Sequence, residues 1–469
     1  MLIMRKNFKQ TTYIMYVVKR RERMRIVFYC TRSNHYNGKY ITYDFYPKKS
    51  DEWNDLSKKY PEHEFIVVAN KPANTLIDLK GDDVVAYPDN VKYILPEVET
   101  QEEVVDLIVD LKPDIAVAVS ASGTTFDWNF LRDSVVGAEL QKRGIKTIAQ
   151  PIFTSVACFD KWRSNLLLRS GQFGVAKAIY VHNEMFFAER EAKALSSNVY
   201  KEYVLYRVKE MDFPVIIKST SGAGSVGIQI VDSYEAAKDV LCSDDNTADV
   251  IVEELLEGEQ FGTEIHGVKG HYHILPPYAL STNKEGITDP YTSVKFGPIK
   301  NDNYNLKELE EMLRRMAEEF NFAGVTQVDL VFNKGKWSVI EINPRWSGMT
   351  TLTAASEGRS PFEIYTQCVT GSDKDYSNPD NLKYVMNFKI PNTENEVLDK
   401  MFNFPGVKFI GKTIADNPSR EKLAFCEVIF GGFDTKEELY NGLVSLKETF
   451  PGVVADAVDS TLKELIEKY

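Results

Sequence analysis

The residues with the clearest chemical potential lie in VTQVDLVFNKGKWSVIEIN (325–343), where Asp329 and Glu341 are twelve residues apart and Asn343 follows. Alternating apolar residues and the turn Asn333-Lys-Gly335 predict a β-hairpin. In that hairpin the two acids come opposite one another, and the period of two puts Glu341 and Asn343 on one face. Opposed like charges repel, and oxygen ligands of this kind suit hard cations. We therefore predict a site for a hard cation such as Mg²⁺.

A second chemical segment is STSGAGSVG (219–227), which spells the glycine fingerprint of dinucleotide-binding proteins. That fingerprint requires a helix to open on its last glycine, whereas IQIV (228–231) is typical of a second strand after FPVIIK (213–218). We therefore predict a glycine-rich hairpin whose backbone N–H groups fold over phosphates, and not an NAD site. Lys218 ends the first strand and is placed to reach the same phosphates, although a lysine there is more often solvated.

A third segment, VIVEELLEGEQF, ends an apolar strand with Glu253 and Glu254. An open strand edge at this point could offer backbone N–H and C=O groups to an adenine, and a carboxylate could accept from its exocyclic amine. Taken alone, a solvated strand end is the simpler interpretation.

Composition sets limits on the class of protein. The 469 residues exceed the size of a single core, so two to four subdomains are expected. The net charge of −12 argues against nucleic-acid binding, and no apolar run is long enough for a membrane helix. The five cysteines are scattered and contain no C-x-x-C pair, so we expect neither disulfides nor a zinc site and favour the cytoplasm. His271 and His273 fall on one face of a strand and are expected to be structural.

The elements that must position these segments change in character along the chain. Residues 1–23 are basic and are expected to be a disordered extension. Residues 24–150 alternate strands with helices, which predicts a parallel α/β domain. Residues 151–375 begin with a helix capped by Asp160 and then turn antiparallel, with a small lobe at about 175–255. Residues 376–469 contain another strand-then-helix unit and predict a C-terminal α+β domain.

The order VIIKSTSGAGSVGIQIV, IVEELLEGEQF, VDLVFNKGKWSVIEINPR resembles the ATP-grasp superfamily over roughly residues 24–370. The most similar branch is that of biotin carboxylase and carbamoyl-phosphate synthetase, and D-alanine-D-alanine ligase is more distant. The resemblance implies the ATP-grasp fold, of mixed α/β and α+β class, with ATP and one or two Mg²⁺ (or Mn²⁺) ions as cofactors. Asp329 stands where many relatives have Glu, which still supplies carboxylate oxygens.

The resemblance also implies roles for single residues. Lys161 would match the first phosphate lysine and Lys218 the second, and residues 219–227 would be the phosphate flap. Glu253 would accept from the adenine amine. The remaining assignments place Ser221, Gly222, Gly224, Ser225 and Gly227 in the flap, the backbones of Glu254 and Leu256 at the base, Glu259 at the ribose, Asp329, Glu341 and Asn343 at the metal, and Arg345 at the acyl-phosphate and tetrahedral intermediates.

The activity implied by this resemblance is an ATP-dependent carboxylate-amine ligase. It would form an amide on an amino acid through an acyl phosphate and release ADP and phosphate. Two alternatives remain open: an ATP-grasp enzyme that uses bicarbonate, and a non-catalytic ATP-binding regulatory protein. Small carboxylates and amines are the expected partners, with no nucleic acid or membrane, and a homodimer is possible. The segment 276–300 is expected to border the acceptor pocket, where Lys295 could meet a carboxylate.

Overall fold

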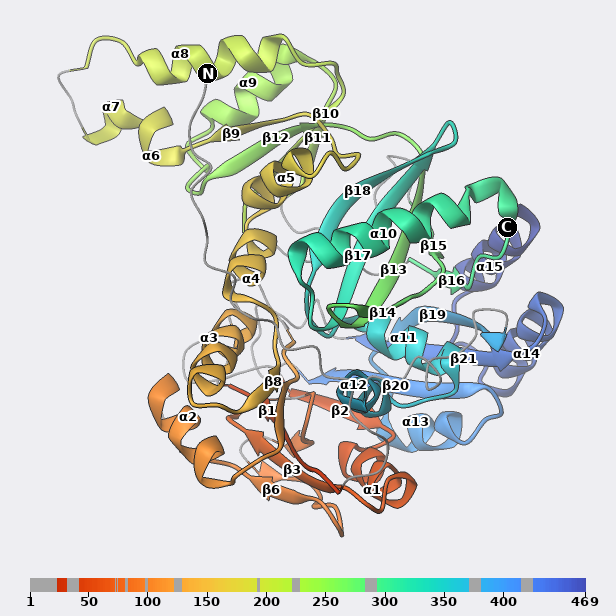
Figure 1. Cartoon of the computed structure of the whole chain (residues 1–469). Coiled ribbons are helices and arrows are strands. Elements are labelled where there is room, and N and C mark those ends of the chain that lie inside the picture. The colour runs from red at the N-terminus through yellow and green to blue at the C-terminus, as the bar shows by residue number, and fades with distance from the viewer. Residues whose placement is uncertain are drawn as a thin grey trace.

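The structure is a computed structural model. It is organised as three layers, each built on one main β-sheet (Figure 1). It describes residues 23–31, 42–71, 73, 75–80, 83–97, 100–121, 129–191, 195–221, 228–282, 293–370, 381–414 and 425–469. The predicted basic extension falls almost entirely outside these ranges. Within them, no helix is long and apolar enough to cross a membrane.

The first layer is the predicted parallel sheet of the N-terminal domain. Its strand order is β6-β3-β1-β7-β8, and all four pairings are parallel. The strands are β1 (Arg25–Cys30), β3 (Glu64–Ala69), β6 (Lys92–Ile94), β7 (Ile115–Ala118) and β8 (Lys146–Ile148), with α1 (Lys49–Lys59), α2 (Gln101–Asp110) and α3 (Asn129–Lys142) between them and a short hairpin of β4 (Leu79–Lys80) and β5 (Asp83–Val84). The strands carry apolar residues on both faces because both faces are buried, as crossover helices require.

The second layer is a small lobe at one end of the molecule, which Figure 1 shows at the top. It is an antiparallel sheet of order β11-β10-β12-β9. Its elements are β9 (Ala178–Val181), α6 (Asn183–Phe186), α7 (Ala188–Glu191), α8 (Val199–Lys209), β10 (Val215–Ser219), β11 (Gln229–Val231), α9 (Tyr234–Cys242) and β12 (Val250–Glu254). Strands β10 and β11 pair antiparallel on either side of the glycine-rich segment, which confirms the hairpin and excludes the strand-to-helix turn of an NAD fingerprint.

The third layer is a large antiparallel sheet of order β18-β17-β13-β15-β16-β19-β21-β20-β2, with β14 paired to β13. Its strands are β2 (Thr42–Tyr46), β13 (Glu259–Val268), β14 (His271–Ile274), β15 (Tyr278–Leu280), β16 (Lys295–Gly297), β17 (Gly324–Asn333), β18 (Lys336–Asn343), β19 (Tyr384–Pro391), β20 (Val407–Ile414) and β21 (Phe425–Phe433). Strands β16 and β19 pair across the predicted domain division at 375/376, so this sheet joins the central and C-terminal regions. Strand β2 of the N-terminal region extends the far edge.

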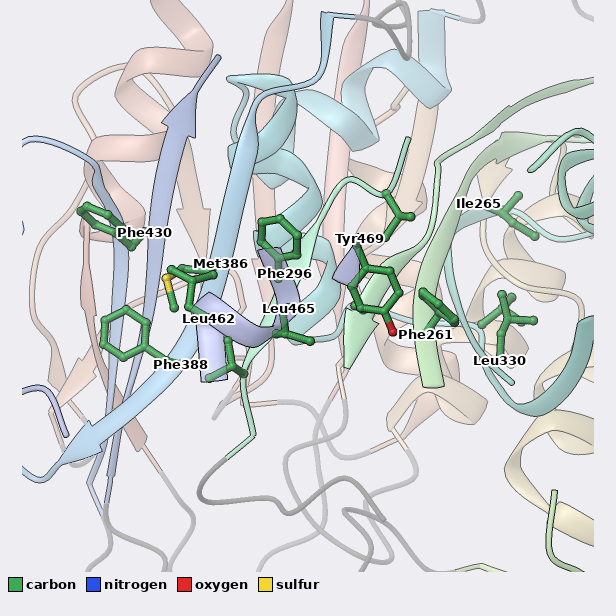
Figure 2. Packing of buried hydrophobic residues seen from close by; sticks show 14 of the residues in the cluster. Phe261, Ile265, Phe296, Leu330, Met386, Phe388, Phe430, Leu462, Leu465 and Tyr469 are labelled. Atoms are coloured by element: carbon green, nitrogen blue, oxygen red, sulfur yellow. The ribbon is translucent and has the colours of Figure 1, made fainter. Parts of the chain in front are cut away.

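Helices cover this sheet and close its core. They are α10 (Leu306–Phe320), α11 (Gly348–Glu357), α12 (Pro361–Thr370), α13 (Asn395–Phe402), α14 (Lys436–Thr449) and α15 (Asp456–Lys468), with a short 3₁₀ turn at Asp302–Tyr304. Figure 2 shows Leu462, Leu465 and Tyr469, in and after α15, among side chains of several strands. The ring of Tyr469 lies 5.5 Å from that of Phe261 in β13, so the last helix packs directly on the sheet that carries the hairpin.

Two further helices lead from the N-terminal sheet into the lobe: α4 (Ile152–Phe159) and α5 (Lys161–Ser170). As predicted, Asp160 caps α5 by accepting from the backbone N–H of Arg163 at 2.9 Å, and Gly171 follows its last residue. The N–H of Lys161 donates to the carbonyl of Thr220 at 2.8 Å. The start of α5 is therefore attached to the base of the glycine-rich hairpin.

The chain between α5 and the lobe is also fixed to the β17–β18 hairpin. The N–H of Val339 in β18 donates to the carbonyl of Gly174 at 2.7 Å. A Cβ atom on Gly174 would lie 2.7 Å from the carbonyl oxygen of Trp337, which explains a glycine at this close approach. These contacts hold the lobe and the large sheet in a defined relation.

The cap of α5 gives a stability prediction. Asp160→Ala removes the acceptor for the first turn and should lower the free energy of unfolding by about 1 kcal/mol. Asp160→Asn keeps a capping oxygen and is the matched control. Thermal denaturation of the three proteins measures the effect, and equal melting temperatures for Asp160→Ala and the native chain would contradict it.

Candidate active site

Asp329 and Glu341 are directly opposed across β17 and β18, as predicted. The tight turn is confirmed as well: Asn333 pairs with Lys336, and Lys334 and Gly335 both have positive φ. A strict two-residue turn, however, would have put Ile340 opposite Asp329. The register shifts by one residue between Asp329 and Leu330, because a β-bulge inserts Ile340. The bulge therefore brings Glu341 to the side of Asp329, which sequence periodicity did not foresee.

The two opposed carboxylates differ in their ionisation. Burial and then the negative charge of Glu341 raise the pKa of Asp329 to about 6. Burial also acts to raise the pKa of Glu341, but the charges of Lys161, Lys218 and Arg345 outweigh it and the pKa is lowered. The pair thus carries one firmly ionised acid and one acid that titrates near neutrality.

Lys161 and Arg345 are two of the basic residues that act on the acids. The ammonium of Lys161, on the first turn of α5, lies 3.1 Å from Oε1 of Glu341. Arg345 follows β18 and donates to Oδ1 of Asn343 at 2.9 Å, so it lies on the face of the two acids. The structure therefore assembles two basic residues predicted for the site around the opposed carboxylates.

Lys218 forms a buried ion pair with Glu253 inside the lobe. Its Nζ lies 2.5 Å from Oε2 of Glu253, and the two side chains are only 9% and 10% exposed. The pairing is diagonal across β10 and β12, since Lys218 stands opposite Ile251. Asn165 of α5 donates weakly to the other oxygen of Glu253 at 3.5 Å. The solvated interpretation of Lys218 is thereby wrong.

The expected open edge at Glu253 and Glu254 needs correction. Strand β12 is internal, paired on one side with β10 and on the other with β9. The N–H of Glu254 donates to Lys177 and that of Leu255 to Pro214, each at 3.0 Å. The Glu254 carboxylate pairs with Lys177 at 3.1 Å. Within the described residues the first backbone N–H with no such bond in this stretch is that of Leu256, so any open edge begins there.

Glu259 lies on a different face from the acids. Phe261 pairs with Leu330 in the core, whereas Gly262 pairs with Asp329, so alternation puts Glu259 with Phe261 and Gln260 with Gly262. The carboxylate of Glu259 accepts from the hydroxyl of Tyr304 at 2.8 Å and lies 3.3 Å from the ammonium of Lys468. Its ribose role stays a prediction, and Gln260 is the neighbour that shares the face of Asp329.

The flap residues are described only at their start. Ser221 is half-buried, and its N–H donates to the hydroxyl of Ser219 at 3.4 Å. The predictions for Gly222, Gly224, Ser225 and Gly227 lie outside the described residues.

A layer of polar residues behind the acids was missed by the sequence interpretation. Gln327 donates to Oδ1 of Asp329 at 2.8 Å and holds it in place. Glu264, which pairs with Gln327 across the strands, accepts from Thr350 at 2.6 Å and from Thr353 at 2.7 Å. Period-two reading of β13 and β17 puts Glu264 and Gln327 on the acid-bearing face. The contacts from α11 could not be read from local sequence.

His266 and His273 continue this layer away from the acids. Nε2 of His266 lies 2.8 Å from Oε2 of Glu264, and Nε2 of His273 lies 3.3 Å from Oε1 of Glu357. These histidines are paired with buried carboxylates. No group of three His, Cys, Asp or Glu side chains in the described part of the chain is arranged to hold a metal.

The donor set at the hairpin nonetheless fits a hard divalent cation. Two opposed carboxylates and the Oδ1 of Asn343, which has a second lone pair beside the one used by Arg345, offer oxygens on one face. Mg²⁺ commonly takes one or two carboxylates from the protein and completes its shell with water and phosphate oxygens. Burial and the charge of Glu341 raise the pKa of Asp329, and a cation bound between the two acids would oppose that effect.

Comparison with known proteins matches most of this site, although not Lys161, to an ATP-grasp domain. Residues 187–349 match the family model described as the ATP-grasp domain, which confirms the resemblance found in the sequence. Carbamoyl-phosphate synthase of Methanobrevibacter smithii is 26% identical over 39% of this chain and 49% of its own length. D-alanine–D-alanine ligase of Buchnera aphidicola is 27% identical over 45% of this chain and 67% of its own length. The match to the first of these relatives spans about half of its length.

Solved structures extend the likeness to nearly the whole fold. The biotin carboxylase domain of 2-oxoglutarate carboxylase from Hydrogenobacter thermophilus, described as a dimer with MgADP, ADP and bicarbonate, covers 96% of each chain with a TM-score of 0.62 and 14% identity. L-amino acid ligase from Bacillus licheniformis covers 91% of this chain and 98% of its own with a TM-score of 0.60 and 13% identity. The overall fold, including the C-terminal region, is thus shared with these solved structures.

The buried pair of Lys218 and Glu253 gives a testable consequence. Glu253→Ala leaves the ammonium buried without its partner and should destabilise the lobe by about 3 kcal/mol. The double variant Lys218→Met, Glu253→Leu should recover most of that loss, because an apolar pair of similar size needs no counterion. Chemical denaturation measures both. A double variant as unstable as the single one would contradict this account.

The ionisation of Asp329 predicts how metal binding depends on pH. A carboxylate must be ionised to bind a cation, and with a pKa of about 6 Asp329 is protonated progressively as the pH falls below that value. Mn²⁺ binding, followed by electron paramagnetic resonance, should be about tenfold weaker at pH 5 than at pH 8. In Asp329→Asn the affinity should be low at both values. A native affinity independent of pH in this window would argue against Asp329 as a ligand.

Proposed function

We propose that the protein is an ATP-dependent carboxylate-amine ligase that forms an amide bond on an amino acid. The observation that carries this proposal is the opposition of Asp329 and Glu341 with Lys161 and Arg345 on the same face. Such a site neutralises charge rather than supplying a nucleophile, which suits phosphoryl transfer to a carboxylate. The similarity to D-alanine–D-alanine ligase and to an L-amino acid ligase fold supports the amide product.

The reaction would run in two steps. A carboxylate oxygen of the first substrate attacks the γ-phosphorus of ATP, the bond to the β-phosphate oxygen breaks, and ADP leaves. The amine nitrogen then attacks the acyl carbon, phosphate leaves, and one amine proton departs with it. A bound Mg²⁺ would supply positive charge for the phosphate oxygens, held by Asp329, Glu341 and Asn343.

The protein's own residues would bind and orient the reactants. Lys218 is proposed to leave Glu253 and contact the nucleotide's phosphates, with the flap at residues 219–227 covering them, while Lys161 contacts the same phosphates from α5. The backbone at Leu256, past the end of β12, would meet the adenine. Arg345 is proposed to stabilise the charge that develops on the reacting acyl group. Preorganised groups of this kind each contribute roughly 3 to 4 kcal/mol to lowering such a barrier.

Two further assignments are proposed, one from the similarity to a solved structure and one from the cysteines. A homodimer is proposed, supported by the description of the biotin carboxylase domain as a dimer. The five cysteines are all free, which supports a reducing compartment such as the cytoplasm.

A reaction that uses bicarbonate as the acid is the second candidate, favoured by the similarity to carbamoyl-phosphate synthase. The two candidates differ in the acid that ADP release requires. It is an amino acid for the first candidate and bicarbonate for the second. A purely regulatory role would not require both acids with two basic residues beside them.

The decisive experiment incubates the protein with ATP, Mg²⁺ and pooled L-amino acids and follows the products by mass spectrometry. ADP should appear together with a condensation product that has lost one water. AMP in place of ADP would overturn the acyl-phosphate route, and ADP formed only with bicarbonate would favour the second candidate.

The metal assignment predicts the behaviour of Glu341→Gln. Loss of one charged ligand should reduce turnover by at least about a hundredfold, while circular dichroism shows an unchanged fold. Glu311→Gln, an exposed change of the same kind on α10, is the control and should keep full activity. Turnover of Glu341→Gln near the native rate would remove this residue from the site.

A further inference from the structure

A second polar cluster lies beside the acids, on three adjacent strands of the large sheet. Lys295 of β16 stands directly opposite Asn387 of β19, and Asn387 donates from Nδ2 to Oε1 of Glu427 in β21 at 3.0 Å. Asn387 is buried, whereas Lys295 and Glu427 are half-buried. The cluster therefore presents one positive and one negative group, with an amide that orients the negative one.

The two charged groups converge on the first turn of α11. A Cβ atom on Gly348 would lie 3.1 Å from Oε1 of Glu427 and 3.7 Å from Nζ of Lys295. No ion pair joins Lys295 to a carboxylate in the part of the chain that the structure describes, so the two charges share this space without neutralising one another directly. Lys389 stands opposite Glu427 across the strands, but its Nζ lies over the ring of Phe425 at 4.4 Å.

The cluster adjoins the predicted metal ligands through the next residue of the helix. A Cβ atom on Gly262 would lie 3.4 Å from Oδ1 of Asp329 and 3.4 Å from Sδ of Met349. Gly348 and Met349 are consecutive in α11. A molecule bound at Gly348 would therefore lie next to the residue that contacts Gly262, beside Asp329. The positive charge of Lys295 also acts to lower the pKa of Asp329, against the larger effects of burial and Glu341.

Opposite charges held apart beside a reaction site match a zwitterion. A carboxylate that approaches Asp329 and Glu341 gains from Lys295 and Arg345, but Glu427 would repel a simple acid such as bicarbonate. If the acid also carries a cationic amine a few ångströms from its reacting carboxylate, that amine can form a charge-assisted hydrogen bond with Glu427. Because Gly348 has no side chain, the start of α11 approaches both charged groups closely.

We propose that Lys295, Asn387 and Glu427 form the binding site for the acid substrate, and that Glu427 selects an α-amino acid by binding its ammonium group. This inference rests on the proposed ligase function and names the substrate class of the same site. It makes the C-terminal region, outside the residues matched by the family model, the source of the specificity-determining residue.

The test compares amino acids with their deaminated counterparts. Saturation-transfer NMR of the full chain with MgADP and pooled L-amino acids identifies a bound member, and the matching acid without the amine is the control ligand. Native protein should bind the amino acid, and Glu427→Gln should weaken that binding by about tenfold or more while MgADP affinity is unchanged. Glu464→Gln, an exposed change on α15, should have no effect.

A second variant distinguishes a role of this cluster in ligand binding from a role in stability. Gly348→Ala adds a methyl group against Glu427 and should raise the KM for the amino acid by about fivefold, yet its melting temperature should not fall, because alanine favours a helix over glycine. A purely structural role for this cluster predicts the opposite, a lower melting temperature with an unchanged KM.

The outcomes distinguish this inference from the proposed function. Amino-acid-dependent ADP release that Glu427→Gln leaves unchanged would overturn the inference while the ligase function stands. Absence of ADP release together with amino-acid binding that is lost in Glu427→Gln would overturn the ligase function but support the site. Equal binding of an amino acid and its deaminated acid by the native protein, or binding of neither, would overturn the inference.

Discussion

The opposition of two carboxylates across one pair of strands is the constraint on which the rest of the site depends. Two opposed carboxylates such as Asp329 and Glu341 repel one another unless positive charge lies nearby. Lys161 and Arg345 supply part of that charge, and a divalent cation would complete it. The arrangement is therefore costly without a cation and favourable with one, which is why we interpret it as a proposed site for a metal-bound nucleotide.

This constraint reaches into all three layers of the molecule. Lys161 comes from α5, whose first N–H is bonded to Thr220 at the base of the glycine-rich hairpin, and β18 is bonded at Gly174 to the chain that enters the lobe. These contacts connect Lys161, the lobe and Glu341. The ion pair with Glu253 gives Lys218, the proposed phosphate lysine, a partner within the lobe.

Hydrogen bonds between buried polar side chains continue behind the two acids into the core. Gln327 holds Asp329, and Glu264 joins the strands to α11 through Thr350 and Thr353. The same helix begins at Gly348, between Lys295 and Glu427. Helix α11 thus connects the residues that support Asp329, a proposed metal ligand, with the proposed substrate site.

The sequence by itself determined the local elements, because their signals are local. Period-two alternation and the turn Asn333-Lys-Gly335 predicted the hairpin, Asp160 predicted the start of α5, and the strand after the glycines excluded the NAD fingerprint. Only the tertiary structure decided three other features: the bulge at Ile340 that sets the two acids face to face, the internal position of β12, and the contacts of Glu259 with Tyr304 and Lys468. Bulges, strand order and contacts between distant segments depend on which surfaces pack together, and residue spacing along one strand carries no record of that. The meeting of Lys295, Asn387 and Glu427 has the same origin, since three strands far apart in the chain become neighbours only when the large sheet closes.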